Sequence, residues 1–365
     1  MRMPAFLGEA PTLSTALGQE RNNFTLIRLA LALAVVVSHA FSVTTGEIMD
    51  EPLTAWTGFT LGEHAVNGFF AISGFLVTMS FDRRGWRDYV TARTLRIAPG
   101  LIVATLAVSL LLGGAMTRLP LAEYLQSDGL RRFITATLTS FKSNIALPGV
   151  FDGNPFRFPM GTVWTLKYEV LCYVGVLALG LVGLLRARGA ALALVTGLAV
   201  ALAALDLLHP DAPKGLETAL RLPLIFAFGG ALYVWRSRAR LSGWLLVALV
   251  AATALAHGTF LYKTLLFLTS AYGVIWLALA PLATRLSWEP KADLSYGTYL
   301  YGWPLQQALH TLFPATAALV LLGPSLVLAL LVAALSWYGV EKPALAIKAK
   351  ALGRRTIKTI EPAAP

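Results

Sequence analysis

The chain has 365 residues, of which 56% are hydrophobic and only 13% are charged. Soluble globular proteins average about 25% charged residues, so the composition excludes an ordinary soluble fold and indicates a membrane protein. The single cysteine, Cys172, excludes a disulfide framework and a cysteine metal cluster. The net charge of +11 comes from cations grouped between apolar stretches, which indicates orientation in a membrane rather than nucleic-acid binding.

Ten stretches with few or no charges follow one another along the chain, and one crossing needs about 20 apolar residues. We therefore predict an all-α fold, a polytopic membrane bundle of about ten transmembrane helices. Pro314 marks the break between the last two stretches. The ten cover residues 22–43, 65–81, 97–116, 161–185, 189–205, 218–235, 241–258, 264–284, 294–313 and 317–340.

The Lys and Arg residues predict the orientation of this bundle. With a cytoplasmic N-terminus, the inner segments hold 20 of these residues and the outer segments hold 8. Because cytoplasmic loops carry the excess of Lys and Arg, both termini are expected in the cytoplasm, with no cleavable signal peptide. The domains are then a cytoplasmic N-terminal segment (1–21), a transmembrane domain (22–343) and a basic, partly disordered cytoplasmic tail (344–365).

Two outer connections differ from simple turns. Residues 44–62 contain three acidic residues and no cation, and residues 117–160 form a long connection rich in Pro, Asn and Phe. Long connections in compact proteins are commonly functional or disordered. We expect both connections to flank a site on the outer side.

Ionisable residues within apolar stretches need an explanation, because charge in the hydrocarbon region is costly. Arg28 and His39 lie 11 residues apart, which is about three helical turns, so they share one face over about 16 Å. Separately, each could be a snorkelling or interfacial residue. Together they predict a polar stripe through the bilayer.

The fourth stretch carries Trp164 near its outer end and Glu169 about two turns deeper. Trp164 fits an aromatic anchor at the interface. A carboxylate at the depth of Glu169 needs a cation or several hydrogen-bond donors, so Glu169 is either a structural ion pair or part of a site.

The second and third stretches contain further candidates. Asn67, Ser73 and Gly74 are small or polar, which is typical of close helix packing and also of a polar site. Arg93 and Arg96 share a helix face at a spacing that suits bidentate phosphate binding, although inner-side anchoring explains them nearly as well. Metal clusters, phosphate-binding Gly-rich loops and a nucleophile elbow are missing from the sequence, so no metal is expected.

These residues belong to segments through which the chain resembles the acyltransferase 3 family of integral membrane acyltransferases, which modify cell-surface glycans. The resemblance extends from about residue 23 to about residue 343. The shared segments are Arg28 with His39, the Phe69–Phe75 segment, Arg93 with Arg96, Trp164 with Glu169, Ser295–Tyr301 and Val340–Pro343. Where many relatives have Asp the chain has Asn67, and where many have a second His it has Gly302.

The resemblance implies an acyl-coenzyme A donor from the cytoplasm and transfer to a hydroxyl on the outer side. It makes His39 the catalytic histidine and Arg28 its partner. We expect Glu169 to pair with Arg28 or to orient His39, in a structural and electrostatic role. The resemblance makes Arg93 with Arg96 the donor-side pair, and we expect Ser73 to lie at the donor as well. The acceptor contacts are expected to be Asn67, Trp164 and Tyr299.

The sequence thus predicts an O-acyltransferase, in particular an O-acetyltransferase, of the bacterial inner membrane. Acyl-coenzyme A is a co-substrate rather than a permanently bound cofactor, and the acceptor is a saccharide such as an exopolysaccharide, an O-antigen or another surface glycan, free or lipid-linked. The alternative is a transporter or flippase without chemistry, since intramembrane Arg, His and Glu also mark solute and proton paths. A non-catalytic scaffold subunit of a glycan-synthesis complex would tolerate replacement of His39 and Glu169.

Overall fold

The computed structural model describes residues 10–19, 21–280, 284, 288 and 290–351, with side chains as far as residue 347. The described residues contain no strand, and a single antiparallel bridge joins Thr12 to Arg240. The predicted all-α class is therefore confirmed for this part of the chain. Residues 1–9 and 20 of the predicted N-terminal segment, and most of the basic tail, residues 352–365, lie outside the described residues.

The helices are named here with the bounds that the structure gives them. They are α1 (Leu13–Leu17), α2 (Phe24–Thr45), α3 (Thr54–Thr57), α4 (Leu61–Arg84), α5 (Trp86–Leu106), α6 (Gly113–Met116), α7 (Leu121–Gln126), α8 (Asp128–Ser140), α9 (Thr165–Leu181), α10 (Arg188–Leu208), α11 (Lys214–Val234), α12 (Gly243–Leu255), α13 (Tyr262–Leu279), α15 (Ser295–Leu312), α16 (Ala318–Ser336) and α17 (Lys342–Ala351). A π-helical segment joins α5 to α6, and another joins α16 to α17.

Every predicted apolar stretch falls on a helix, and 7 of the helices are long and apolar enough to cross a membrane. Among the helices that carry the ten predicted stretches, three do not meet that standard: α9 has 17 residues, α12 has 13, and α15 has 18 but is more polar. The chain is thus a multi-pass helical protein. A count of ten crossings and the side on which the termini lie stay predictions.

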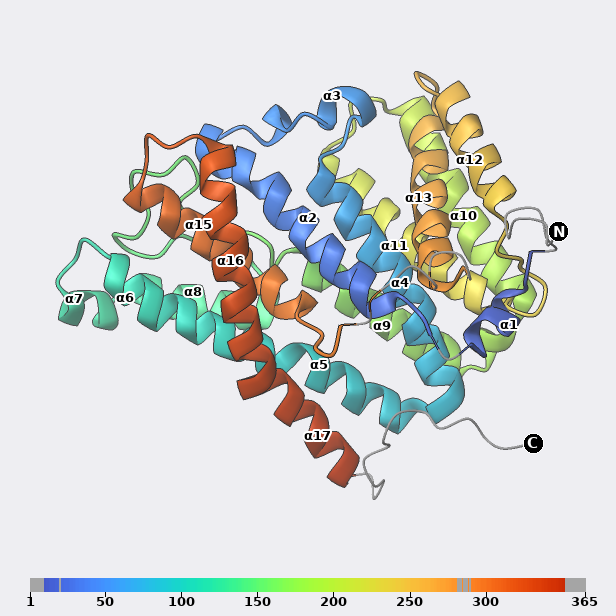
Figure 1. Ribbon diagram of the computed structural model, residues 1–365, viewed down its shortest axis with the longest axis horizontal. Coiled ribbons are helices and arrows are strands. Elements are labelled where there is room, and N and C mark those ends of the chain that lie inside the picture. The colour runs from blue at the N-terminus through green and yellow to red at the C-terminus, as the bar shows by residue number, and fades with distance from the viewer. Residues whose placement is uncertain (1–9, 20, 281–283, 285–287, 289, 352–365) are drawn as a thin grey trace.

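Helix α4 lies at the centre of the bundle, packs most extensively against α11 and also contacts α2, α9 and α13 (Figure 1). Glycines permit this packing. A Cβ on Gly74 would lie 1.9 Å from the carbonyl oxygen of Phe226, and one on Gly229 would lie 2.2 Å from that of Ala71. The sequence interpretation of close helix packing is therefore confirmed at Gly74.

The ends of α2 and α4 are defined by local signals. Gly46, with φ of 83°, ends α2 in the left-handed conformation that glycine adopts without strain. Thr60 and Glu63 form a capping box that begins α4. Helix α2 also packs against α15 and α16, and its Ser38 and Ser42 are buried.

The long connection of residues 117–160 contains two helices, α7 and α8, which lie beside α6 at the left of Figure 1. Helix α8 buries Leu130, Phe133 and Thr137 on one face. Its residues therefore belong to the folded body of the protein.

Candidate active site

A small cavity of about 90 Å³ lies among α2, α4, α5, α9 and α15. We call it the arginine cavity. Six residues singled out from the sequence line it: Arg28, Ser73, Arg93, Arg96, Glu169 and Tyr299. The structure thus brings together residues from five helices that are far apart in the chain.

Asp293 joins two of these arginines. Its Oδ2 lies 2.8 Å from Nη1 of Arg28 and 3.0 Å from Nη2 of Arg96. The other guanidinium nitrogen of Arg96, Nη1, lies 3.6 Å from Oε2 of Glu341. Two neighbouring arginines are therefore held in fixed positions by carboxylates.

The electrostatics of Asp293 follow from these contacts. Burial alone would raise the pKa of its carboxyl group, but Arg28, Arg96 and hydrogen bonds from Ser295 hold that pKa well below the ordinary range. The Ser295 hydroxyl donates to Oδ1 of Asp293 at 2.5 Å. Asp293 is therefore ionised at neutral pH.

Arg93 differs from the other two arginines. It forms no ion pair with a described carboxylate, and its guanidinium carbon lies 5.6 Å from the centroid of the Tyr173 ring. The Tyr173 hydroxyl donates a hydrogen bond to Glu169, which is the contact that holds the Glu169 carboxylate. The guanidinium of Arg93 thus contacts an aromatic ring, whereas those of Arg28 and Arg96 contact carboxylates.

A second, larger cavity of about 450 Å³ contains His39 and is called the histidine cavity. The His39 ring lies edge-on to Trp303, with ring centroids 4.9 Å apart, and its buried Nδ1 has no hydrogen-bond partner among the described residues. Trp303 stacks on Phe158 at 5.4 Å. Trp164, which is expected to contact the acceptor, also lines this cavity.

The two cavities adjoin, because Val66 and Tyr299 line both of them. The Tyr299 hydroxyl donates to the Thr162 carbonyl at 2.8 Å and lies 2.6 Å from Oγ1 of Thr165. Tyr299 therefore forms a fixed part of the partition between them. Arg28 and His39, on the same helix, line cavities on opposite sides of this partition.

Other predicted residues lie elsewhere. Asn67 is fully buried, its amide has no hydrogen-bond partner among the described residues, and it lines neither cavity. Glu169 lines the arginine cavity and not the histidine cavity, so it does not orient His39 by direct contact. Two further histidines, His64 and His310, do not line the histidine cavity either.

Sequence analysis missed Asp293 and gave no role to Glu341. A signal for Asp293 exists: it immediately precedes the predicted stretch 294–313, and two intramembrane arginines need an anion. Nothing in the sequence pairs it with a particular arginine, since Asp293 is 265 residues from Arg28.

Comparison with known proteins shows the family of the chain. The model of an acyltransferase domain matches residues 21–338, which is most of the chain. The chain belongs to the acyltransferase 3 family. This finding confirms the family that the sequence motifs indicated.

Two relatives show how far the similarity extends. A protein of Shigella phage Sf6 named O-acetyl transferase is 26% identical over 338 residues, covering 88% of this chain and 95% of the relative. A protein of Rhizobium leguminosarum bv. viciae named Nodulation protein 10 is 28% identical over 365 residues, covering 92% and 96%. No solved structure gives a significant match.

Proposed function

We propose that this acyltransferase moves an acyl group, and in particular acetyl, from cytoplasmic acyl-coenzyme A to a hydroxyl of an extracytoplasmic or lipid-linked saccharide. In this proposal it acts in the bacterial inner membrane with both termini in the cytoplasm. The observation that carries the proposal is the adjacency of the two cavities. Arg28, Arg93 and Arg96 line one, His39 lines the other, and among the described residues Val66 and Tyr299 are common to both.

The size and charge of the arginine cavity support a role in donor binding. Ligand pockets commonly measure about 300–1,000 Å³, so a cavity of about 90 Å³ suits a thin chain rather than a nucleotide. The pantetheine arm of coenzyme A is such a chain. Arg93 and Arg96 would bind the donor's phosphate groups, because guanidinium matches phosphate geometry. Ser73 and Arg28 would contact the pantetheine arm farther along its length.

The histidine cavity supports a role in acceptor binding and proton transfer. Its volume of about 450 Å³ lies within the range for small-molecule sites. His39 would take the proton of the acceptor hydroxyl, whose oxygen attacks the thioester carbonyl. The C–S bond then breaks, coenzyme A leaves as its thiolate, and the histidine proton neutralises that thiolate. Trp164 and Tyr299 would hold the sugar ring and the acyl end of the donor.

The proposal is tested by mass spectrometry of surface glycans from cells with the wild-type gene, without it, and with the His39→Ala variant. We expect the wild-type glycan to carry an added acyl mass, 42 Da for acetyl, that both other strains lack. Membrane abundance of the variant is measured by immunoblot as a control. A glycan that is absent from the deletion strain, rather than present without the acyl group, would contradict the proposal and favour a transporter.

A further inference from the structure

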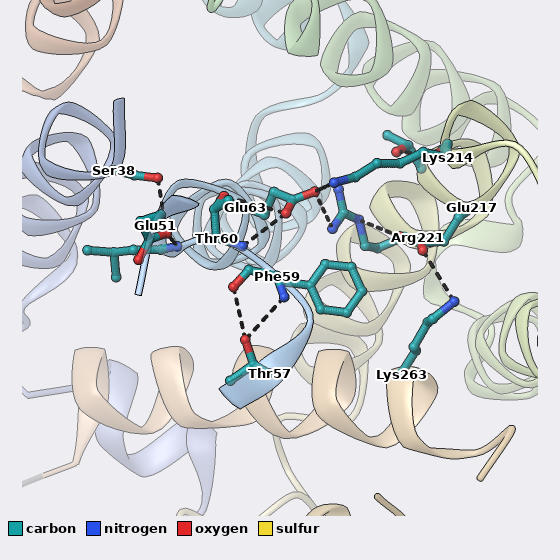
Figure 2. Close-up of polar contacts among 12 residues, drawn as sticks. Ser38, Glu51, Thr57, Phe59, Thr60, Glu63, Lys214, Glu217, Arg221 and Lys263 are labelled. Carbon is teal, nitrogen blue, oxygen red and sulfur yellow. Dashed lines mark hydrogen bonds and ion pairs between the residues drawn. The ribbon is translucent and has the colours of Figure 1, made fainter. Parts of the chain in front are cut away.

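One side of the histidine cavity is built on a network of charged residues that we call the rim network (Figure 2). Glu63 accepts an ion pair from Lys214 at 2.8 Å and another from Arg221 at 3.6 Å. The remaining pairs are Arg221–Glu217 at 3.8 Å, Lys263–Glu217 at 3.4 Å and Lys263–Asp206 at 2.7 Å. The network joins α4, α10, α11 and α13.

The rim network balances its own charge, since it contains three cations and three carboxylates. Arg221 is only 1% exposed and lies 5.4 Å from the ring centroids of both Phe59 and Phe267. Such a buried, paired arginine positions helices and has no free charge for a ligand. The three network residues that line the histidine cavity, Glu63, Lys214 and Arg221, therefore do not make it an anion site.

Lys167 lines the same cavity and is not part of the network. It is exposed, forms no ion pair among the described residues, and its ammonium lies 4.7 Å from the centroid of the Tyr168 ring. It also lies in the first turn of α9, where the helix dipole disfavours a cation. Helix stability thus does not explain Lys167, and its positive charge in the cavity is uncompensated.

Aromatic side chains line the cavity beside this charge. Tyr168 and Trp164 come from the start of α9 and the residue before it, and Phe156, Phe158 and Trp303 lie near His39. Aromatic rings offer apolar faces on which a sugar ring can pack. The cavity therefore combines a surface for a sugar, one histidine and one unpaired ammonium.

We propose that the acceptor saccharide carries an anionic group, a carboxylate or a phosphate, and that Lys167 binds this group while an acceptor hydroxyl faces His39. The inference rests on the proposed function, because it names the chemical class of the acceptor. A carboxylate would come from a uronic acid, and a phosphate from a phosphorylated sugar or from the carrier of a lipid-linked saccharide.

Binding and transfer are measured separately with the full chain in phosphatidylcholine nanodiscs. The three probes are methyl glucoside, methyl glucuronide and methyl glucoside 6-phosphate, which share one ring and differ in the group at C6. Ligand-observed NMR without donor gives the affinities, and acetyl-coenzyme A is then added to measure transfer. The variants are Lys167→Gln and, as a matched loss of one exposed cation that lines neither cavity, Arg132→Gln.

We expect wild type to bind at least one charged probe about tenfold more tightly than the neutral probe, the lower end of the range for a hydrogen bond to a charged group. Lys167→Gln should remove this preference and leave the neutral probe unaffected, and Arg132→Gln should change neither. Which charged probe binds better distinguishes carboxylate from phosphate.

Equal affinity for all three probes, or a preference that survives Lys167→Gln, would overturn the inference. It would also be overturned if Lys167→Gln mattered only in nanodiscs containing phosphatidylglycerol, which would make Lys167 a lipid contact. These outcomes are separate from the proposed function, because that function fails if the wild type acylates no surface glycan in cells, whatever the probes show.

Discussion

Arg28 and Arg96 lie on different helices and share the carboxylate of Asp293. Removing one partner of such a cluster leaves the opposite charges without compensation. The resulting loss of folding free energy exceeds the net stabilisation that the ion pair gives. Asp293 is 17% exposed at its side chain, so solvent reduces this cost but does not abolish it.

Asp293→Asn is therefore expected to reduce stability by about 2–3 kcal/mol, below the upper range for fully buried pairs. Because the pKa of Asp293 is lowered in the fold, the stabilisation is present above the ordinary pKa of about 3.9 and is lost as pH falls through the folded value. Thermal unfolding in detergent should show a lower midpoint for the variant at pH 7, and a smaller difference from wild type at the acidic limit. Asp128→Asn, at a carboxylate whose side chain is 98% exposed, is the control and should unfold like wild type. Equal midpoints for Asp293→Asn and wild type at pH 7 would contradict the role of the ion pairs.

Arg93 gives the cleanest test of donor binding. Arg96 pairs with two carboxylates, so its replacement would disturb the fold as well as the donor site. Arg93 has no ion pair with a carboxylate that the structure describes, and Arg93→Gln should raise the donor KM about 10- to 100-fold, with kcat changed less than KM. The KM of wild type for the donor should also rise with salt concentration, and the KM of the variant should rise less steeply.

The control is Arg87→Gln, at an exposed position at the start of α5, which should leave the donor KM unchanged. An unchanged donor KM in Arg93→Gln would remove Arg93 from the donor site.

At the level of elements, the close approach of α4 and α11 sets the position of Ser73, which lines the arginine cavity. Gly74→Ala would place a Cβ 1.9 Å from a backbone oxygen, so the two helices must separate. We expect a loss of about 1–3 kcal/mol, as for overpacked cores, and a lower thermal midpoint. Gly197→Ala is the matched control, because a Cβ there meets nothing within 4 Å. Equal midpoints for the two variants would contradict the packing argument.

Apolar length predicted the helices well, because hydrophobic stretches long enough to cross a bilayer are helical. It predicted the crossings less completely. Helix α15 is buried along most of its length by neighbouring helices, so its polar residues contact protein. Its hydropathy is therefore lower than that of the other long helices although it lies inside the bundle. Helix α8 was missed within a long connection, although its buried residues at 130, 133 and 137 follow the spacing of an amphipathic helix.

Candidate site residues could be predicted from the sequence where they share one helix face or one short motif. The arginine cavity gathers six of the singled-out residues, whereas contacts between distant segments, such as Asp293 with Arg28, depend on the fold. Asn67 lies apart from the other candidates. A polar residue in an apolar helix suggested substrate binding, but the structure buries it outside both cavities.

For the whole molecule, the proposed topology places both termini on one side. Single cysteines in a Cys172→Ser background test it, since Cys172 itself is buried. Residues 50, 128 and 238 are exposed, and we expect an impermeant thiol reagent to label cysteines at 50 and 128 from outside and at 238 only from inside. Labelling of 50 and 238 from the same side would contradict the topology and the transfer across the membrane that depends on it.

The most direct test of the account is acetyl transfer across a bilayer by the purified full-length protein in proteoliposomes. Labelled acetyl-coenzyme A is supplied on the side of the termini and the saccharide acceptor on the opposite side, and label on the acceptor is counted. The account predicts transfer by wild type and at least a 100-fold lower rate for His39→Ala at equal reconstitution, since general acid–base catalysis contributes about 10²–10⁴-fold. Transfer by His39→Ala at a rate close to that of wild type would contradict it.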